Sequence, residues 1–155
     1  MWLRKHKPLR LAERRPSGKH WLPEPKCDGF RFQIIKDGSA VRFYSRHGAY
    51  DTERLPGMRK AFAELPADAA IIDGELCLVD LRGEAHFWQL MSQMRSRWPD
   101  ENRLMFLAFD LSHQDSADLR SETLTQRKRA LDRLCRGAGA LPPPGRGVRG
   151  RRGPI

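Results

Sequence analysis

The sequence predicts an α+β domain in which antiparallel strands form the core and helices pack outside them. Strand-like runs near the start are separated by Asp-Gly dipeptides, which favour tight hairpin turns because both residues accept positive φ. Further apolar runs of strand length follow, and segments with helical periodicity lie between them. At 155 residues, the chain fits one domain or part of a larger one, with a modest core.

Three strands are expected in the first third of the chain, over residues 21–26, 30–36 and 40–45. The dipeptides Asp28-Gly29 and Asp37-Gly38 would form the turns between them, so the three strands make an antiparallel meander. Lys26 would then stand at the end of the first strand, beside the first turn.

The rest of the chain alternates between helices and strands. A short helix is expected over 58–65, a buried strand over 70–79 and another strand over 104–111. Apolar residues at helical spacing predict an amphipathic helix over 87–98, whose apolar stripe faces the core. A basic helix is expected over 126–135, with Thr125 as its N-cap.

Composition narrows the class of partner. The net charge is +10 and the isoelectric point is about 10.3, which favours a polyanion such as nucleic acid, although part of this charge belongs to tails and solvated faces. The three cysteines lack metal-ligand spacing, so we expect a reducing compartment without a disulfide scaffold. No apolar run reaches membrane-spanning length and no secretory signal is present, so a cytoplasmic location without membrane association is expected.

The two ends differ in composition from the middle. Residues 1–20 form a basic, irregular segment, and 136–155 consist almost entirely of Gly, Pro and Arg. The second segment cannot bury enough apolar surface to offset its ordering entropy, so we expect it to be disordered. It is either a nucleic-acid-binding arm or the product of an out-of-frame reading of a GC-rich gene. The central domain would span 21–135.

The most informative motif is K-x-D-G-x-R, formed by Lys26 to Arg31, with Glu24 two positions upstream. A lysine amine can attack phosphorus when it is held beside a nucleotide and kept partly neutral. Three short motifs follow in order: S-R-x-G at 45–48, D-G-E-L at 73–76 and F-D-L at 109–111. Their order and spacing carry more weight than any one of them.

These motifs resemble the adenylation domain of ATP-dependent DNA ligases, most closely the bacterial repair-type enzymes, over about 21–135. The resemblance implies an incomplete nucleotidyltransferase fold, of the DNA ligase and mRNA capping enzyme type, with the nucleotide between antiparallel sheets. It also implies sealing of nicks in double-stranded DNA during repair and recombination, by a monomer that uses ATP and Mg²⁺ through a lysine-AMP intermediate.

Site residues follow from the same resemblance. Lys26 would be the nucleophile, and Glu24 would recognise the adenine amino group. Arg31 and Arg46 would contact the ribose and later the 5′-phosphate of the nick, because guanidinium suits bidentate phosphate contacts. Glu75 would bind the ribose hydroxyl or help to hold the metal. Phe109 would stack on the adenine ring. The alternatives are ordinary surface residues and, for Phe109, a place in the core.

Two family patterns are not found after Phe109: an E-G-hydrophobic strand and an L-K-x-K segment. The C-terminal oligonucleotide-binding domain of these ligases is also missing. Without the phosphate-binding lysines, electrostatic stabilisation of the reaction is reduced, so we expect weak or undetectable nick sealing. The rival interpretations are an RNA ligase or capping-type enzyme, a degenerate fragment that only binds nucleic acid, and a chain that does not fold stably.

Overall fold

The computed structural model describes residues 14, 18, 21–22, 24, 26–48, 52–80 and 84–136. Most of the predicted 1–20 segment lies outside the described residues. So does the predicted 136–155 tail, with the exception of Arg136, which ends the last helix.

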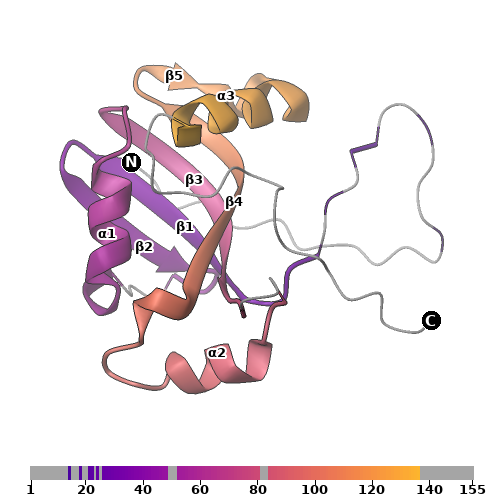
Figure 1. Cartoon of the computed structure of the whole chain (residues 1–155). Coiled ribbons are helices and arrows are strands. Elements are labelled where there is room, and N and C mark those ends of the chain that lie inside the picture. The colour runs from indigo at the N-terminus through magenta and orange to yellow at the C-terminus, as the bar shows by residue number, and fades with distance from the viewer. Residues whose placement is uncertain are drawn as a thin grey trace.

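One antiparallel sheet of five strands, in the order β2-β1-β3-β4-β5, organises the described part of the chain. Helix α1 lies beside β2, α2 lies below the sheet and α3 lies next to β4 and β5 (Figure 1). This arrangement confirms the α+β prediction, although the described residues form one sheet where we expected more. The strands are β1 (Phe30–Asp37), β2 (Ala40–Ser45), β3 (Ala69–Leu78), β4 (Leu104–Gln114) and β5 (Ala117–Asp118).

The core lies on one face of β1, β2 and β3, where apolar side chains meet across the strands. Ile34 pairs with Phe43 on β2 and with Ile72 on β3, and all three are buried. Phe62 of α1 lies edge-on to Phe43, with ring centroids 5.8 Å apart, and to Phe106 of β4, at 5.2 Å. Such edge-to-face pairs add to the stabilisation from burial, so the Phe62 ring helps to hold α1 on this face.

The predicted strand over 21–26 is wrong. Trp21, Leu22, Glu24 and Lys26 all lie outside strands. The sequence explains this, because Pro23 and Pro25 have no backbone N–H to donate to a neighbouring strand. Lys26 therefore lies in a loop that leads into β1, and it does not stand at the end of a hairpin strand.

The β1–β2 hairpin is confirmed, with its turn one residue later than predicted. The turn is formed by Gly38 and Ser39. Gly38 has φ +56°, a conformation that glycine adopts without steric cost. Its N–H also donates to the carbonyl of Asp68 at 2.7 Å, so this turn is joined to the start of β3.

Two helices differ from prediction at their ends. Helix α1 (Pro56–Ala63) begins earlier, with a proline in its first turn, where the missing N–H is of no consequence. Helix α2 (Phe87–Gln93) ends well before Trp98. Arg54 donates to the carbonyls of Met94 and Ser96, and these contacts support a chain that leaves the helix. Trp98 is consequently 62% exposed and does not belong to the apolar stripe.

Helix α3 (Leu124–Arg136) packs against β4. Its predicted N-cap, Thr125, is wrong, because the cap is Thr123. The Thr123 hydroxyl accepts from the Gln126 N–H at 3.4 Å, and the Gln126 side chain accepts from the Thr123 N–H at 2.9 Å. This reciprocal pair is a capping box. Within the described residues, no helix has the length and apolar character to cross a membrane.

Candidate nucleotide site

Lys26 lies in the loop immediately before β1, and its side chain is 74% exposed. Its ammonium forms a hydrogen bond and an ion pair with the carboxylate of Asp28. The hydrogen bond to Asp28 raises the pKa of Lys26 above its usual value, although burial opposes the change slightly. In this state the amine holds its proton, so its lone pair is not available for attack.

Gly29 brings this loop into contact with β3. Its N–H donates to the Glu75 carboxylate at 3.1 Å. A Cβ at position 29 would lie 2.2 Å from the Leu76 carbonyl oxygen and 2.9 Å from the Cys77 sulfur. The glycine of the K-x-D-G motif is thus required for close approach to β3, whereas the sequence had suggested a hairpin turn.

Glu75 lies beside the loop that carries Lys26. Burial raises the pKa of Glu75 above its usual range, while the Gly29 N–H and the charges of Arg31 and Lys26 act in the opposite direction. A half-buried carboxylate with this balance of influences is well placed to receive a cation.

Arg31 stands opposite Glu75 in the β1–β3 register. Its guanidinium lies 3.6 Å from the Asp73 carboxylate and 5.2 Å from the centre of the Phe109 ring. This is a cation–π arrangement. Arg31 covers one face of the Phe109 ring, so a base can stack only on the other face unless Arg31 moves.

Phe109 is directed toward Arg31 by an irregularity in the sheet. Asp73 pairs with Asp110 and Gly74 pairs with Ala108, so Phe109 has no partner on β3. The extra residue is a β-bulge, and bulges commonly redirect a side chain beside a functional site. Gly74 fits here because a Cβ would lie 2.3 Å from the Phe106 ring.

Helix α3 completes the network from the other side. The Lys128 ammonium donates to the Phe109 carbonyl at 2.6 Å and forms an ion pair with Glu24. Next to it, Arg127 holds both carboxylate oxygens of Asp110, at 2.8 and 3.1 Å. The bidentate contact raises the pKa of Arg127.

Five of the six predicted site residues thus belong to one set of residues linked by side-chain contacts, backbone contacts and strand pairing, which we call the site network: Glu24, Lys26, Arg31, Glu75 and Phe109, joined through Asp28, Gly29, Asp73 and Lys128. The sixth, Arg46, is exposed in the Ser45–Gly48 turn that follows β2. Ser45 pairs with Phe32, so Arg46 lies close to the start of β1.

Sequence reasoning missed Lys128, Arg127 and Asp110. The sequence predicts a basic helix here but assigns these side chains no role. A signal was available, because Arg127 and Lys128 precede Leu131 by four and three positions and therefore share its inward face. Their side chains are only 19% and 18% exposed.

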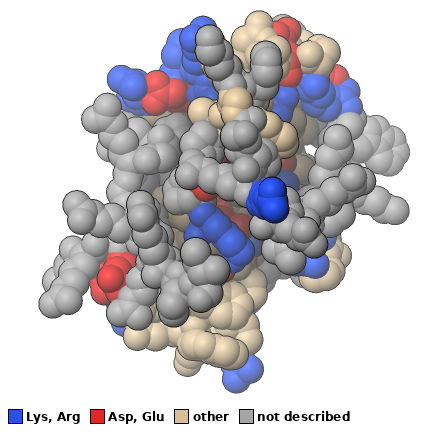
Figure 2. Space-filling view, turned by 90° about the vertical axis from the view of Figure 1, so that its right-hand side faces the viewer, with Lys and Arg blue, Asp and Glu red and all other residues tan. Residues whose placement is uncertain are grey.

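One face of the molecule carries acidic and basic side chains together. Figure 2, which views the right-hand side of Figure 1, shows Lys or Arg next to Asp or Glu in the middle of that face. Its lower part, in the direction of α2, is mainly uncharged.

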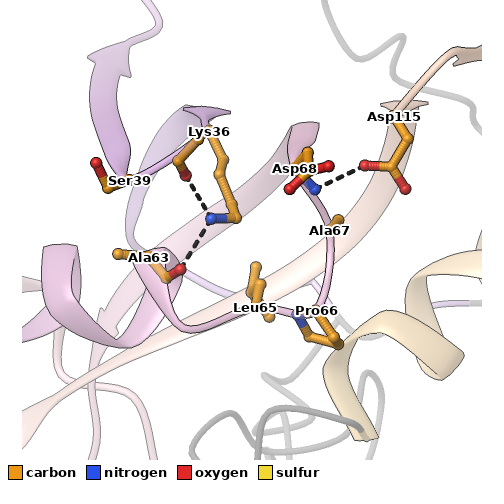
Figure 3. A pocket seen from close by; sticks show the side chains of 9 residues that line it. Lys36, Ser39, Ala63, Leu65, Pro66, Ala67, Asp68 and Asp115 are labelled. Carbon is orange, nitrogen blue, oxygen red and sulfur yellow. Dashed lines mark hydrogen bonds between the residues drawn. The ribbon is translucent and has the colours of Figure 1, made fainter.

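A hollow of about 650 Å³ lies far from this network and has a structural explanation. Lys36 lies near the far end of β1, which at strand geometry is roughly 20 Å from its start. Its ammonium donates to the carbonyls of Gly38 at 2.6 Å and Ala63 at 2.8 Å, while Asp115 accepts from the Asp68 N–H at 2.7 Å (Figure 3). These bonds join the end of α1 to the β1–β2 turn and the start of β3 to the end of β4. None of the sequence motifs lies at this hollow.

A second polar group follows β3. One carboxylate oxygen each of Asp80 and Glu84 and one ring nitrogen of His86, atoms that could bind a metal ion, lie within 4.8 Å of one another. Asp80 accepts from the Glu84 N–H at 2.9 Å and lies 3.0 Å from the His86 Nε2. These contacts close the turn between β3 and α2, which accounts for the arrangement.

Comparison of the sequence with known proteins finds several relatives. A sequence model described as "ATP dependent DNA ligase domain" matches residues 6–141. The chain is 35% identical over 127 residues to the multifunctional non-homologous end joining protein LigD of Pseudomonas aeruginosa, covering 82% of this chain and 15% of that protein. It is 36% identical over 111 residues to a probable DNA ligase of Beutenbergia cavernae, covering 69% of this chain and 22% of that protein.

Solved structures show the same relationship. The ligase domain of Mycobacterium tuberculosis LigD aligns with a TM-score of 0.65 at 30% identity, over 79% of this chain and 40% of that one. A mycobacterial DNA ligase D complexed with ATP and MES aligns with a TM-score of 0.63 at 28% identity, with the same coverage. The chain spans less than half of each relative. By sequence and by fold, it belongs to the ATP-dependent DNA ligase domain family, as part of an adenylation domain related to that of LigD.

Proposed function

We propose that this chain is the nucleotidyltransferase portion of an ATP-dependent DNA ligase. The Lys26 amine attacks the α-phosphate of ATP, a nitrogen–phosphorus bond forms and pyrophosphate leaves. The AMP then passes to the 5′-phosphate of a DNA nick. The observation that carries this proposal is the site network, in which residues of the K-x-D-G-x-R, D-G-E-L and F-D-L motifs are linked to one another.

The amine of Lys26 must lose its proton before it can attack. The Asp28 carboxylate favours the protonated form of the amine. A cation bound near the carboxylates of Asp28 and Glu75 would offset this effect. Glu75 and Asp28 supply oxygen ligands of the kind that Mg²⁺ prefers, and Glu75 would hold the ion together with phosphate oxygens. Bound there, Mg²⁺ would neutralise phosphate charge and favour the neutral amine.

The other residues of the network bind and orient the nucleotide. Phe109 offers one ring face to the base, and Glu24 accepts a hydrogen bond from the adenine amino group. Arg31 lies between the Phe109 ring and the Asp73 carboxylate. From there it can contact the ribose and then, together with Arg46, a phosphate. Arg31 must leave Phe109 if the base stacks on the covered face.

Nicked double-stranded DNA is the proposed substrate for two reasons. The net charge of +10 favours a polyanion, and the names of several relatives describe DNA ligases.

Transfer of AMP to a nick tests this proposal. The protein is incubated with Mg²⁺ and α-labelled ATP, and with duplexes whose 5′-phosphorylated strand at the nick is DNA or RNA. We expect label on the DNA strand and none with Lys26→Ala. Transfer to RNA alone would instead indicate an RNA ligase, and label on protein without transfer to either strand would contradict the DNA step.

A purely binding role makes a different prediction. A degenerate fragment would bind DNA with an affinity that falls steeply with salt, that is unchanged by ATP and that is the same for Lys26→Ala. Such a result, together with no labelled strand, would contradict the enzymatic proposal.

A further inference from the structure

Lys128 of α3 joins two parts of the site network that lie far apart in the sequence, the loop that carries Glu24 and the bulge of β4 at Phe109. Its ammonium donates to the Phe109 carbonyl and pairs with the Glu24 carboxylate. The Lys128 side chain is 18% exposed and that of Glu24 is 43% exposed. A half-exposed glutamate in a loop has many rotamers, and a fixed cation nearby reduces that freedom.

The Phe109 carbonyl needs such a donor for a structural reason. Because Phe109 has no partner on β3, the bulge disrupts the ladder at that point and an acceptor there has to be satisfied in another way. Lys128 supplies the donor at 2.6 Å. The backbone carbonyl at the Phe109 bulge and the Glu24 carboxylate are therefore held by the same nitrogen atom.

We infer that Lys128 is a positioning residue that makes the site specific for adenine. This inference rests on the proposed function, in which Phe109 stacks on the base and Glu24 accepts from its amino group. An ionised carboxylate only accepts hydrogen bonds. It favours the 6-amino group of adenine and disfavours the 6-carbonyl of hypoxanthine or guanine. Lys128 keeps that carboxylate beside the stacking ring and balances its charge.

The test compares ATP with inosine triphosphate, which carries a carbonyl in place of the 6-amino group. Equilibrium dialysis of the full chain against each labelled nucleotide, with EDTA present, measures recognition of the base without covalent chemistry. We expect the wild type to prefer ATP. Lys128→Met should reduce that preference about tenfold, because a charge-assisted contact is lost.

Three further variants separate positioning from folding. Lys128→Arg keeps a cation and should retain most of the preference. Arg129→Met removes the neighbouring exposed charge and should change nothing. In a Glu24→Gln background, Lys128→Met should alter the preference less than twofold, because its effect passes through Glu24. If Lys128→Met does not fold, Lys128→Gln still donates to the Phe109 carbonyl and serves the same comparison.

The inference is overturned if Lys128→Met weakens both nucleotides equally, if Arg129→Met has the same effect, or if the wild type does not prefer ATP. The proposed function has a separate readout in the transfer of AMP. A chain that prefers ATP through Lys128 but never carries AMP keeps the inference and loses the proposed function. If the chain carries AMP but Lys128→Met leaves its preference for ATP unchanged, the proposed function is kept and the inference about Lys128 is lost.

Discussion

At the scale of single residues, Gly29 matters because of the space that it leaves empty. An added methyl group would meet the backbone carbonyl of Leu76, which cannot move without displacing β3. We expect Gly29→Ala to lower the free energy of unfolding by about 1–3 kcal/mol, as overpacking does. Urea denaturation followed by circular dichroism measures this.

Gly57→Ala is the matched control for Gly29. There the added methyl group would lie 3.2 Å from the Glu101 carboxylate, the end of a flexible side chain that can shift. Its unfolding free energy should stay within about 1 kcal/mol of wild type. Equal effects of the two substitutions would show that the close approach at Gly29 is unimportant.

Glu75 gives the fold a defined pH dependence. Burial raises its pKa in the folded chain, so between the ordinary value of about 4.3 and the raised one, the folded state binds a proton that the unfolded state has lost. The contribution of Glu75 to folding stability is therefore complete below its ordinary pKa, and it is lost as pH rises through its raised pKa in the folded chain.

Replacing Glu75 with glutamine removes this titration. We expect Glu75→Gln to become more stable relative to wild type as pH rises above the ordinary glutamate pKa of about 4.3, measured as unfolding free energy in urea at several pH values. Glu64→Gln, at an exposed position, should track wild type throughout. A constant difference between Glu75→Gln and wild type across this range would contradict the assignment.

At the scale of elements, the start of α3 allows a paired comparison. The sequence predicted Thr125 as the N-cap, and the structure shows a capping box formed by Thr123 and Gln126. Thr123→Ala should therefore lower the unfolding free energy by about 1 kcal/mol. Thr125→Ala should change it by less than about 0.5 kcal/mol, and the opposite ranking would restore the sequence-based prediction.

The attachment of α3 to β4 depends on Arg127 and Asp110, whose side chains are 19% and 27% exposed. Removing one partner leaves a largely buried charge, so Arg127→Met should lower the unfolding free energy by about 2 kcal/mol. A double-mutant cycle with Asp110→Asn should give a coupling energy of about 1–2 kcal/mol. Additive effects would show that the two side chains act independently.

Element prediction succeeded where local pattern decides structure and failed where distant contacts do. Apolar pairs such as Ile34-Ile35 and Ile71-Ile72 indicate strands, because β-branched apolar side chains pack well on the buried surface of a sheet. The early end of α2 depends on Arg54, which donates to carbonyls at the end of that helix. No pattern within the helix itself reveals this contact.

At the scale of the whole molecule, the sequence named most of the candidate residues that the structure brings together but not what joins them. Glu24, Lys26, Arg31, Glu75 and Phe109 could be named because they lie in short motifs of fixed order. Lys128 and the bulge at Phe109 could not, since both arise from pairing between distant segments. The motifs therefore indicate the candidate residues, and the sheet register provides their arrangement.

The most direct test of the central claim is the intact mass of the protein after incubation with ATP and Mg²⁺, with Lys26→Ala and the exposed-lysine variant Lys60→Ala alongside. The proposal predicts one added AMP on the wild type and on Lys60→Ala, and none on Lys26→Ala. Folded wild-type protein that gains no mass, or a Lys26→Ala protein that still gains AMP, would contradict the role of Lys26 as nucleophile.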